Sequence, residues 1–233
     1  MGVGLPLAKY DFGQGIIWNG TNQYGIITNI AGATFPKTAF SFICWFRFVL
    51  PHKSPLGGFF TSRDTNSSTP YVRVQHSFVS SIQSSISFAT TNPGYTLIIP
   101  GGVNTAIHQL GITYDGTTAR YYFDGVLIDS AAKSVSDFPN NFYNVSEVGR
   151  DGLTSGWESR GVFGDMKLIN LTITDAQIKE NFNNAKGSNN LDILAASSLT
   201  CSFWYQFNGN GDDSSGNSRH LTLQNSPTYE TFN

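Results

Sequence analysis

The chain is built from short apolar runs that are separated by Gly, Pro, Asn and Asp. The longest run covers residues 40–49. Its alternation places Phe40, Phe42, Cys44, Phe46 and Phe48 on one face, with Ile43, Trp45 and Val49 among the residues on the other. Because both faces are largely apolar, the run predicts a central strand that is covered on both sides.

Turn residues bound the other predicted strands. These strands cover residues 71–75, 85–89, 95–99, 147–150, 162–171, 199–207 and 219–224. Residues 52–70 are rich in polar and turn-forming residues, although Phe59 and Phe60 lie among them. We therefore predict a long loop there.

A meander of three strands is predicted at residues 108–114, 118–123 and 126–129. Asp-Gly pairs at residues 115–116 and 124–125 join these strands. An Asp-Gly pair supplies the positive φ angles that a tight hairpin requires. The pattern therefore predicts consecutive antiparallel strands.

One helix is predicted late in the chain. Thr174 and Gln177 have the spacing of a capping box, and Ile178 and Phe182 begin an apolar stripe. Gly187 is the expected end of the helix. Many short strands with a single late helix predict an all-β protein, a two-sheet antiparallel sandwich. No interior linker divides the chain, so we expect one domain over residues 1–233.

Several of these runs resemble the concanavalin A-like, laminin G-like jelly-roll domains. The run at residues 108–129, which begins His-Gln-Leu-Gly-Ile-Thr-Tyr-Asp-Gly, is similar to their central meander, and residues 18–24 are similar to an early strand. Residues 40–47, 148–151 and 163–178 extend the similarity over most of the chain. The resemblance implies a jelly roll. It implies little about function, because this fold hosts lectins, hydrolases, lyases and adhesion or structural modules.

The last part of the chain departs from that family pattern. Residues 202–223 resemble a segment that often opens such domains, yet here the segment comes last. Residues 199–233 are therefore expected to form a strand pair that closes the sandwich, or else a swapped or appended tail. Jelly-roll termini usually lie close together, so a permuted order can close the same fold.

Composition excludes several classes of function. The 233 residues carry 14 basic and 16 acidic side chains, a net charge of −2. This balance excludes a broad electrostatic footprint for nucleic acid. No run reaches the roughly 20 apolar residues of a membrane span. The first residues lack the basic start and apolar run of a Sec signal peptide, so we expect cytosolic synthesis with lysis or a non-Sec route, or a processed mature chain.

Cys44 and Cys201 each lie in an apolar run. We expect two buried thiols, with a disulfide as the alternative. The absence of any Cys-x-x-Cys pair or Cys/His cluster argues against a zinc site.

Acid–base catalysis is not expected. The chain has four glutamates, Glu147, Glu158, Glu180 and Glu230, and none has the spacing of the paired carboxylates on a retaining glucanase strand. Gln75 and His76 are adjacent, so a strand would send them to opposite faces, unlike the Gln-x-His strand of alginate-lyase-like members. We therefore predict a protein that is not an enzyme.

One loop combines an aromatic side chain with planar polar groups, as a sugar site requires. Trp157 is the candidate platform, and Arg150, Asp151 and Glu158 are the candidate hydrogen-bonding partners of a glycan. The alternative is that Trp157 packs on the edge of the sandwich and the charges are solvated.

A second loop carries hard oxygen ligands. Asp212, Asp213 and Asn217 are candidate calcium ligands. The alternative is that these side chains cap the turns of their own backbone. No other cofactor is expected.

These observations predict a non-catalytic structural or display module. We expect a phage virion surface protein, a capsid decoration or fibre-associated component, with weak glycan binding. Its partners would be other virion or surface proteins and further copies of itself. The alternative is a carbohydrate-binding lectin module of a bacterial surface or secreted protein, which would bind cell-surface glycan outside the cell. A polysaccharide-active enzyme is a third hypothesis.

Overall fold

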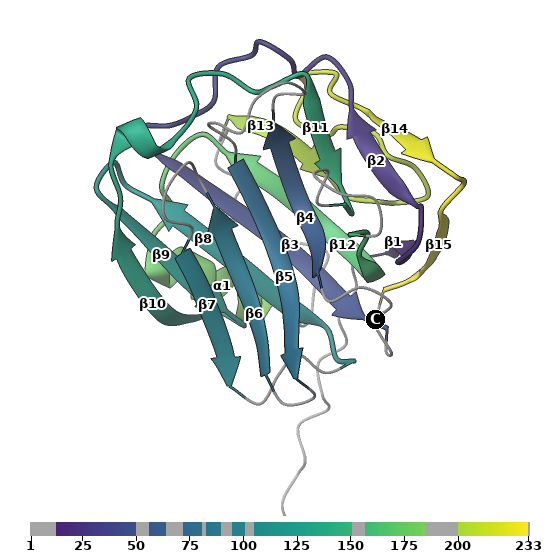
Figure 1. Ribbon diagram of the computed structural model, residues 1–233, viewed down its shortest axis with the longest axis horizontal. Coiled ribbons are helices and arrows are strands. Elements are labelled where there is room, and N and C mark those ends of the chain that lie inside the picture. Colours follow the sequence, from purple (N-terminus) through teal and green to yellow (C-terminus); the bar gives the residue numbers. More distant parts are fainter. Residues whose placement is uncertain are drawn as a thin grey trace, which may run out of the picture.

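The computed structural model describes residues 13–49, 56–63, 72–80, 83–89, 95–100, 105–150, 157–184 and 200–232. These residues form two antiparallel β-sheets that pack face to face, with one α-helix against the outer side of one sheet (Figure 1). The arrangement confirms the predicted all-β jelly-roll sandwich with a late helix.

The larger sheet has eight strands in the order β10-β9-β8-β3-β12-β1-β15, and β13 also pairs with β12. Its strands are β1 (Gln14–Asn19), β3 (Phe40–Phe48), β8 (His108–Tyr114), β9 (Thr118–Phe123), β10 (Val126–Ala132), β12 (Arg160–Ile169), β13 (Cys201–Tyr205) and β15 (Thr228–Thr231). The meander predicted from the Asp-Gly pairs is β8-β9-β10. Asp124 and Gly125 have φ angles of 51° and 75°, as a tight hairpin requires.

The smaller sheet has seven strands in the order β14-β2-β11-β4-β5-β6-β7. Its strands are β2 (Tyr24–Ile27), β4 (Leu56–Arg63), β5 (Val72–Ser80), β6 (Gln83–Ala89), β7 (Tyr95–Pro100), β11 (Val145–Val148) and β14 (Leu221–Gln224).

The loop predicted over residues 52–70 is wrong in its middle, because β4 runs through it. The β4–β5 register shifts between Gly58 and Phe60, so Phe59 and Phe60 both join the core. This β-bulge breaks the alternation that marks a strand in sequence, and the two preceding glycines resemble turn residues.

β3 occupies the middle of the larger sheet, between β8 and β12, as its two apolar faces predict. Its phenylalanines lie in the core between the sheets, whereas Ile43 and Trp45 lie in a second apolar cluster under α1 (Asp175–Asn184). The Trp45 ring stacks on Phe182 of this helix with the ring centroids 5.7 Å apart. Burial of each such side chain stabilises the fold by about 1.5–3 kcal/mol.

The predicted capping box begins α1. The Gln177 backbone N–H donates to Thr174 Oγ1 at 3.2 Å, and the Thr174 N–H donates to Gln177 Oε1 at 2.8 Å. Ile178 is buried in the cluster below. The predicted end at Gly187 lies outside the described residues.

The C-terminal segment contributes strands to both sheets within the chain. β13 pairs with β12, β14 pairs with β2, and β15, which was not predicted, pairs with β1. Exchange of this segment between two chains stays a prediction. Cys44 and Cys201 are both buried, and neither forms a disulfide within the described part of the chain. In that same part, no helix combines the length and the apolar character needed to cross a membrane.

Candidate functional site

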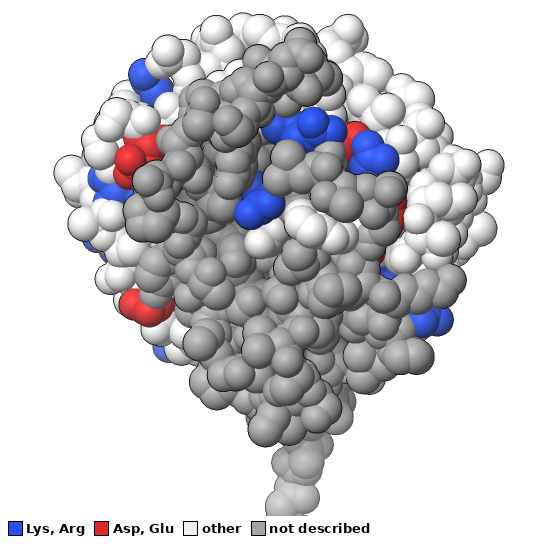
Figure 2. All heavy atoms as spheres, in the orientation of Figure 1, with Lys and Arg blue, Asp and Glu red and all other residues white. Residues whose placement is uncertain are grey.

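Basic side chains gather on the outer face of the seven-stranded sheet. The inward-facing residues of β4, β5 and β11 in the core are Phe60, Val72, Val74 and Val148. Strand alternation therefore turns the intervening residues outward, and these are Thr61, Arg63, Arg73 and Glu147. We call these four residues, with Arg150 just after β11, the arginine face. Figure 2 shows Lys and Arg side chains close together on this side of the molecule.

Strand register fixes the order of residues across the arginine face. Thr61 of β4 lies opposite Glu147 on one side and opposite Arg73 on the other. Arg63 lies two residues further along β4, opposite Val145. Arg63 and Arg73 are therefore diagonal neighbours on adjacent strands, a relation that separates residues by roughly 7–8 Å.

Arg150 neutralises a buried carboxylate. Glu147 is only 2% exposed, and Arg150 Nε donates to Glu147 Oε2 at 3.2 Å while its Nη2 contacts Oε1. The Arg150 guanidinium also lies 3.6 Å from the centre of the Tyr24 ring. Burial alone would lower the pKa of Arg150, but the hydrogen bond and charge of Glu147, with Tyr24 and Glu158 nearby, raise it overall.

The backbone before Arg150 is constrained. Gly149 has a φ of +82°, and a Cβ built there would lie 2.9 Å from the buried Trp18 ring. Only glycine meets both conditions without strain. The close packing of this turn on Trp18 therefore fixes where Arg150 leaves β11.

The predicted glycan residues are partly brought together. Arg150 and Glu158 form an antiparallel β-bridge, and Glu158 is buried with its Oε2 lacking a hydrogen-bond partner among the described residues. Trp157 is half-buried, and Asp151 lies outside the described residues. A glycan contact at these residues stays a prediction. Sequence reasoning did not find Glu147 and Tyr24 as the partners of Arg150.

A cleft of about 720 Å³ lies between two loops at one end of the sandwich. The loops precede β3 and β11, and the second includes a short 3₁₀ turn, η1 (Val135–Asp137). The polar residues that line this cleft, which we call the amide cleft, are Lys37, Ser136, Asn140, Asn141, Tyr143 and Asn144. Its volume is within the range of small-molecule sites.

The amide cleft adjoins the arginine face. The Tyr143 backbone N–H donates to Ser62 Oγ at 3.0 Å, and Ser62 immediately precedes Arg63. Asn144 immediately precedes Val145, which is the register partner of Arg63. The two features are therefore neighbours at the end of β4.

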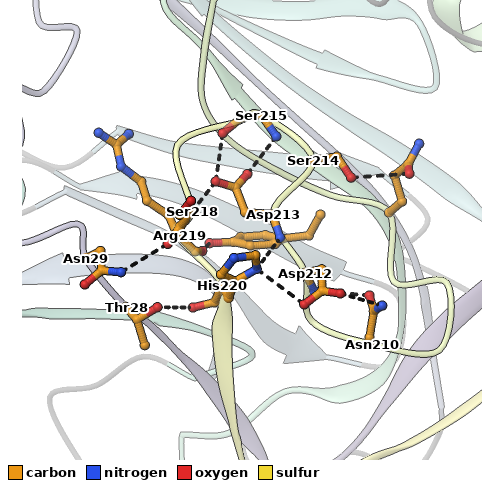
Figure 3. Close-up of polar contacts among 12 residues, drawn as sticks. Thr28, Asn29, Asn210, Asp212, Asp213, Ser214, Ser215, Ser218, Arg219 and His220 are labelled. Atoms are coloured by element: carbon orange, nitrogen blue, oxygen red, sulfur yellow. Dashed lines mark hydrogen bonds and ion pairs between the residues drawn. The ribbon is translucent and has the colours of Figure 1, made fainter.

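The predicted calcium loop is held by hydrogen bonds centred on Asp213 (Figure 3). Asp213 Oδ1 accepts from the backbone N–H groups of Trp204 and Ser215, each at 2.9 Å. Its Oδ2 accepts from Ser215 Oγ at 2.8 Å and from the Arg219 N–H at 3.0 Å. A carboxylate has about four acceptor positions, and these donors use them.

The other two candidate ligands also face protein groups. The Asn217 side-chain amide donates to the Cys201 carbonyl at 2.7 Å, and Asp212 Oδ1 lies 3.3 Å from His220 Nδ1. Within the described residues no cluster of three or more His, Cys, Asp or Glu side chains could hold a metal ion. This geometry favours the alternative that the loop is capped by its own side chains. Calcium binding stays a prediction.

Comparison with known proteins gives a fold and no family. No protein-family model and no curated protein matches the chain. Among solved structures, the chain is similar to a proposed carbohydrate-binding protein from Bacteroides ovatus, with a TM-score of 0.68 and 13% identity. That match covers 96% of this chain and 61% of the other, so the chain spans less than two thirds of that protein.

Two further solved structures have the same fold. A heptameric SAP-like pentraxin from Limulus polyphemus gives a TM-score of 0.59 at 11% identity, covering 73% of this chain and 81% of the pentraxin. The CBM40 domain of the Ruminococcus gnavus IT-sialidase, bound to α2,3-sialyllactose, gives 0.52 at 13% identity, covering 73% of this chain and 98% of CBM40. At these identities the similarity shows the fold alone. None of the three is a virion protein by name, so the expected virion role has no support here.

Proposed function

We propose that the chain is a non-catalytic carbohydrate-binding module that acts outside the cell or at a surface. The observation that carries this proposal is the amide cleft, a small-molecule-sized hollow whose lining combines five neutral polar side chains with apolar surface. This is the lectin alternative of the sequence analysis, and it replaces the virion role as the main hypothesis.

The lining of the cleft suits sugar hydroxyls. Each asparagine amide offers both a donor and an acceptor in one plane, so it can pair with a hydroxyl that donates and accepts. Asn140, Asn141 and Asn144 supply three such groups, and Tyr143 adds an aromatic ring with a polar tip. Lys37 is already held, since its Nζ contacts Asn140 Oδ1.

The fold neighbours support the same class of ligand. The CBM40 domain was solved with α2,3-sialyllactose, and the Bacteroides ovatus protein is proposed to bind carbohydrate. Because their sequence identity to this chain is low, the identity of its ligand must be inferred from the site itself.

The arrangement of Glu147 argues against hydrolysis at the arginine face. A catalytic carboxyl group needs access to a substrate oxygen, but Glu147 is buried and ion-paired to Arg150. Glu147 is therefore a poor candidate for a general acid or base at this face.

A glycan array followed by calorimetry tests the proposal. Wild-type protein should bind a defined set of glycans, and the double variant Asn140→Ala/Asn144→Ala should lose at least tenfold in affinity. Asn183→Ala is the matched control, because Asn183 is exposed on α1, away from the cleft. Trp157→Ala tests the loop predicted from sequence: a loss confined to that variant moves the site to the loop. An array with no binding overturns the proposal.

A further inference from the structure

We infer that the amide cleft selects sugars that carry an acetamido group, with Lys37 and Asn140 donating to the acetamide carbonyl and the apolar part of the lining contacting its methyl group. This inference rests on the proposed function and names the ligand class for the same cleft.

Lys37 and Asn140 form a corner of the cleft that offers hydrogen-bond donors. The Lys37 Nζ contacts Asn140 Oδ1. A lysine ammonium has three donors and no acceptor, so two of its protons remain after this contact. The same contact uses the amide oxygen of Asn140 and leaves its two Nδ2 protons as the group that it offers. A ligand atom at this corner must therefore be an acceptor.

Backbone hydrogen bonds between the two loops hold this corner in place. The Phe35 N–H donates to the Asn140 carbonyl at 2.9 Å. The Phe142 N–H donates to the Ala33 carbonyl at 2.8 Å. Lys37 lies two residues after Phe35, so its loop is tied to the loop of Asn140 before a ligand arrives. Such preorganisation lowers the entropy cost of binding.

Part of the lining is apolar and belongs to the core. Phe138, Pro139 and Phe142 line the cleft, and all three are buried. Phe138 and Phe142 pack on Phe35, whose ring centre lies 6.2 Å and 5.1 Å from theirs. They are only 3% and 2% exposed, so the apolar surface that they offer is small. A surface of this kind matches a methyl group more closely than the face of a whole sugar ring.

An acetamido group meets both requirements. Its carbonyl oxygen accepts hydrogen bonds and donates none, as the corner of Lys37 and Asn140 requires. Its methyl group is apolar and gains by leaving water for the phenylalanine surface. Its N–H can donate to an amide oxygen, and Asn141 and Asn144 bring such oxygens to the same cleft. A hydroxyl at the same carbon accepts from the corner but brings no methyl group.

A carboxylate would satisfy the donors but not the apolar surface. Among the described residues that line the cleft, Lys37 is the only charged one, and it is half-buried. Water therefore still solvates its ammonium, and an ion pair at such a position contributes little. A carboxylate would also lose hydration against the phenylalanines. These terms favour the neutral acetamide over an anion.

Matched sugar pairs test the inference. We would measure by calorimetry the binding of N,N′-diacetylchitobiose beside cellobiose, and of methyl N-acetylgalactosaminide beside methyl galactoside. Within each pair the members differ only where an acetamido group replaces a hydroxyl. The acetamido member of at least one pair should bind tenfold or more tightly, a difference equivalent to about 1.4 kcal/mol. Methyl glucuronide is measured as the anionic alternative.

Variants assign this preference to the corner of the cleft. Lys37→Met removes the ammonium and keeps the length of the side chain, so the ratio of the two affinities should fall to about one. Lys37→Arg should keep part of the preference, because arginine also donates. Asn140→Asp replaces the amide donors with an acceptor and should remove the preference as well. Lys179→Met is the matched control and should keep the full ratio, because Lys179 is exposed on α1.

The outcomes separate the two proposals. Equal binding within both pairs, or array binding confined to glycans without an acetamido group, overturns the inference and leaves the proposed function standing. Tighter binding of methyl glucuronide than of any acetamido sugar assigns Lys37 to a carboxylate and also overturns the inference. A preference that survives both Lys37→Met and Asn140→Asp does the same, because the acetamido group then binds elsewhere. No binding of any sugar, on the array or in calorimetry, overturns both proposals.

Discussion

Replacing Asp213 should destabilise the whole sandwich. Its carboxylate accepts three backbone N–H groups, from Trp204, Ser215 and Arg219, together with the Ser215 hydroxyl. The loop that it holds joins β13 in one sheet to β14 in the other. Asp213→Ala therefore removes the acceptor for several groups where the chain crosses between sheets.

The expected loss follows from those contacts. Asp213 is 8% exposed, so water cannot easily replace the carboxylate. Hydrogen bonds to a charged group contribute about 1.5–3 kcal/mol each, but such terms are not additive within one cluster. We expect Asp213→Ala to lower the free energy of unfolding by about 3–5 kcal/mol. Asp213→Asn should cost less, because the amide keeps one acceptor oxygen.

Urea denaturation followed by tryptophan fluorescence measures this loss. The matched control is Asp212→Ala, which removes the adjacent carboxylate, whose side chain is 65% exposed. The control should change the free energy of unfolding by less than about 0.5 kcal/mol. If Asp213→Ala stays within 1 kcal/mol of wild type, the carboxylate does not hold the loop and the reasoning fails.

The same melts decide the calcium prediction. If the donors occupy the Asp213 oxygens as described, the midpoint should be equal in calcium and in a chelator. A calcium-dependent rise that Asp213→Ala abolishes would instead identify the loop as a metal site.

Three other perturbations have defined outcomes. Burial and a hydrogen bond to the Asp175 carboxylate of α1 raise the pKa of Tyr122 to about 12. The stabilisation from the neutral tyrosine is therefore fully present below pH 10 and is lost between pH 10 and 12. In urea denaturation, the free energy of unfolding of Tyr122→Phe should decline less over this pH range than that of wild type. Gly149→Ala should lower the free energy of unfolding by at least about 2 kcal/mol, because the new Cβ meets a positive φ and also clashes with the Trp18 ring. Gly216→Ala is the control, because Gly216 has a φ of +84° but open space around it. It should cost only the roughly 1–2 kcal/mol of the backbone conformation. Deleting residues 199–233 should leave insoluble protein, since it removes β13, β14 and β15 from the two sheets; a soluble folded truncation would indicate an appended or swapped tail.

Local rules predicted most of the fold. Two apolar faces placed 40–49 in the middle of a sheet, Asp-Gly at 124–125 predicted a hairpin, and Thr174 with Gln177 marked the start of α1. Each signal depends on residues within one element or one turn. β4 was missed because its bulge and its glycines cancel the local signal.

The Asp213 loop belongs to the same predictable class. Its donors and acceptors lie mostly within a few residues of one another, so turn capping was already an alternative in the sequence. The asparagines at residues 140, 141 and 144 gave a weaker local signal, a concentration of amides in one loop. What makes that loop a cleft is the second loop at residues 32–37, which no spacing along the chain connects to it.

The arginine face could not be found by spacing at all. Arg63 and Arg73 are joined by a long polar stretch in sequence, and Glu147 is far from both, yet strand register sets them side by side. A sheet face is defined by pairing between strands, so its chemistry depends on the register of β4 with β5 and β11. Once β4 is recognised, alternation alone turns Arg63 away from the core, because Phe60 and Ser62 face inward. The β-bulge breaks the alternation pattern of β4, so the sequence predicted neither this strand nor the arginine face that it helps to form.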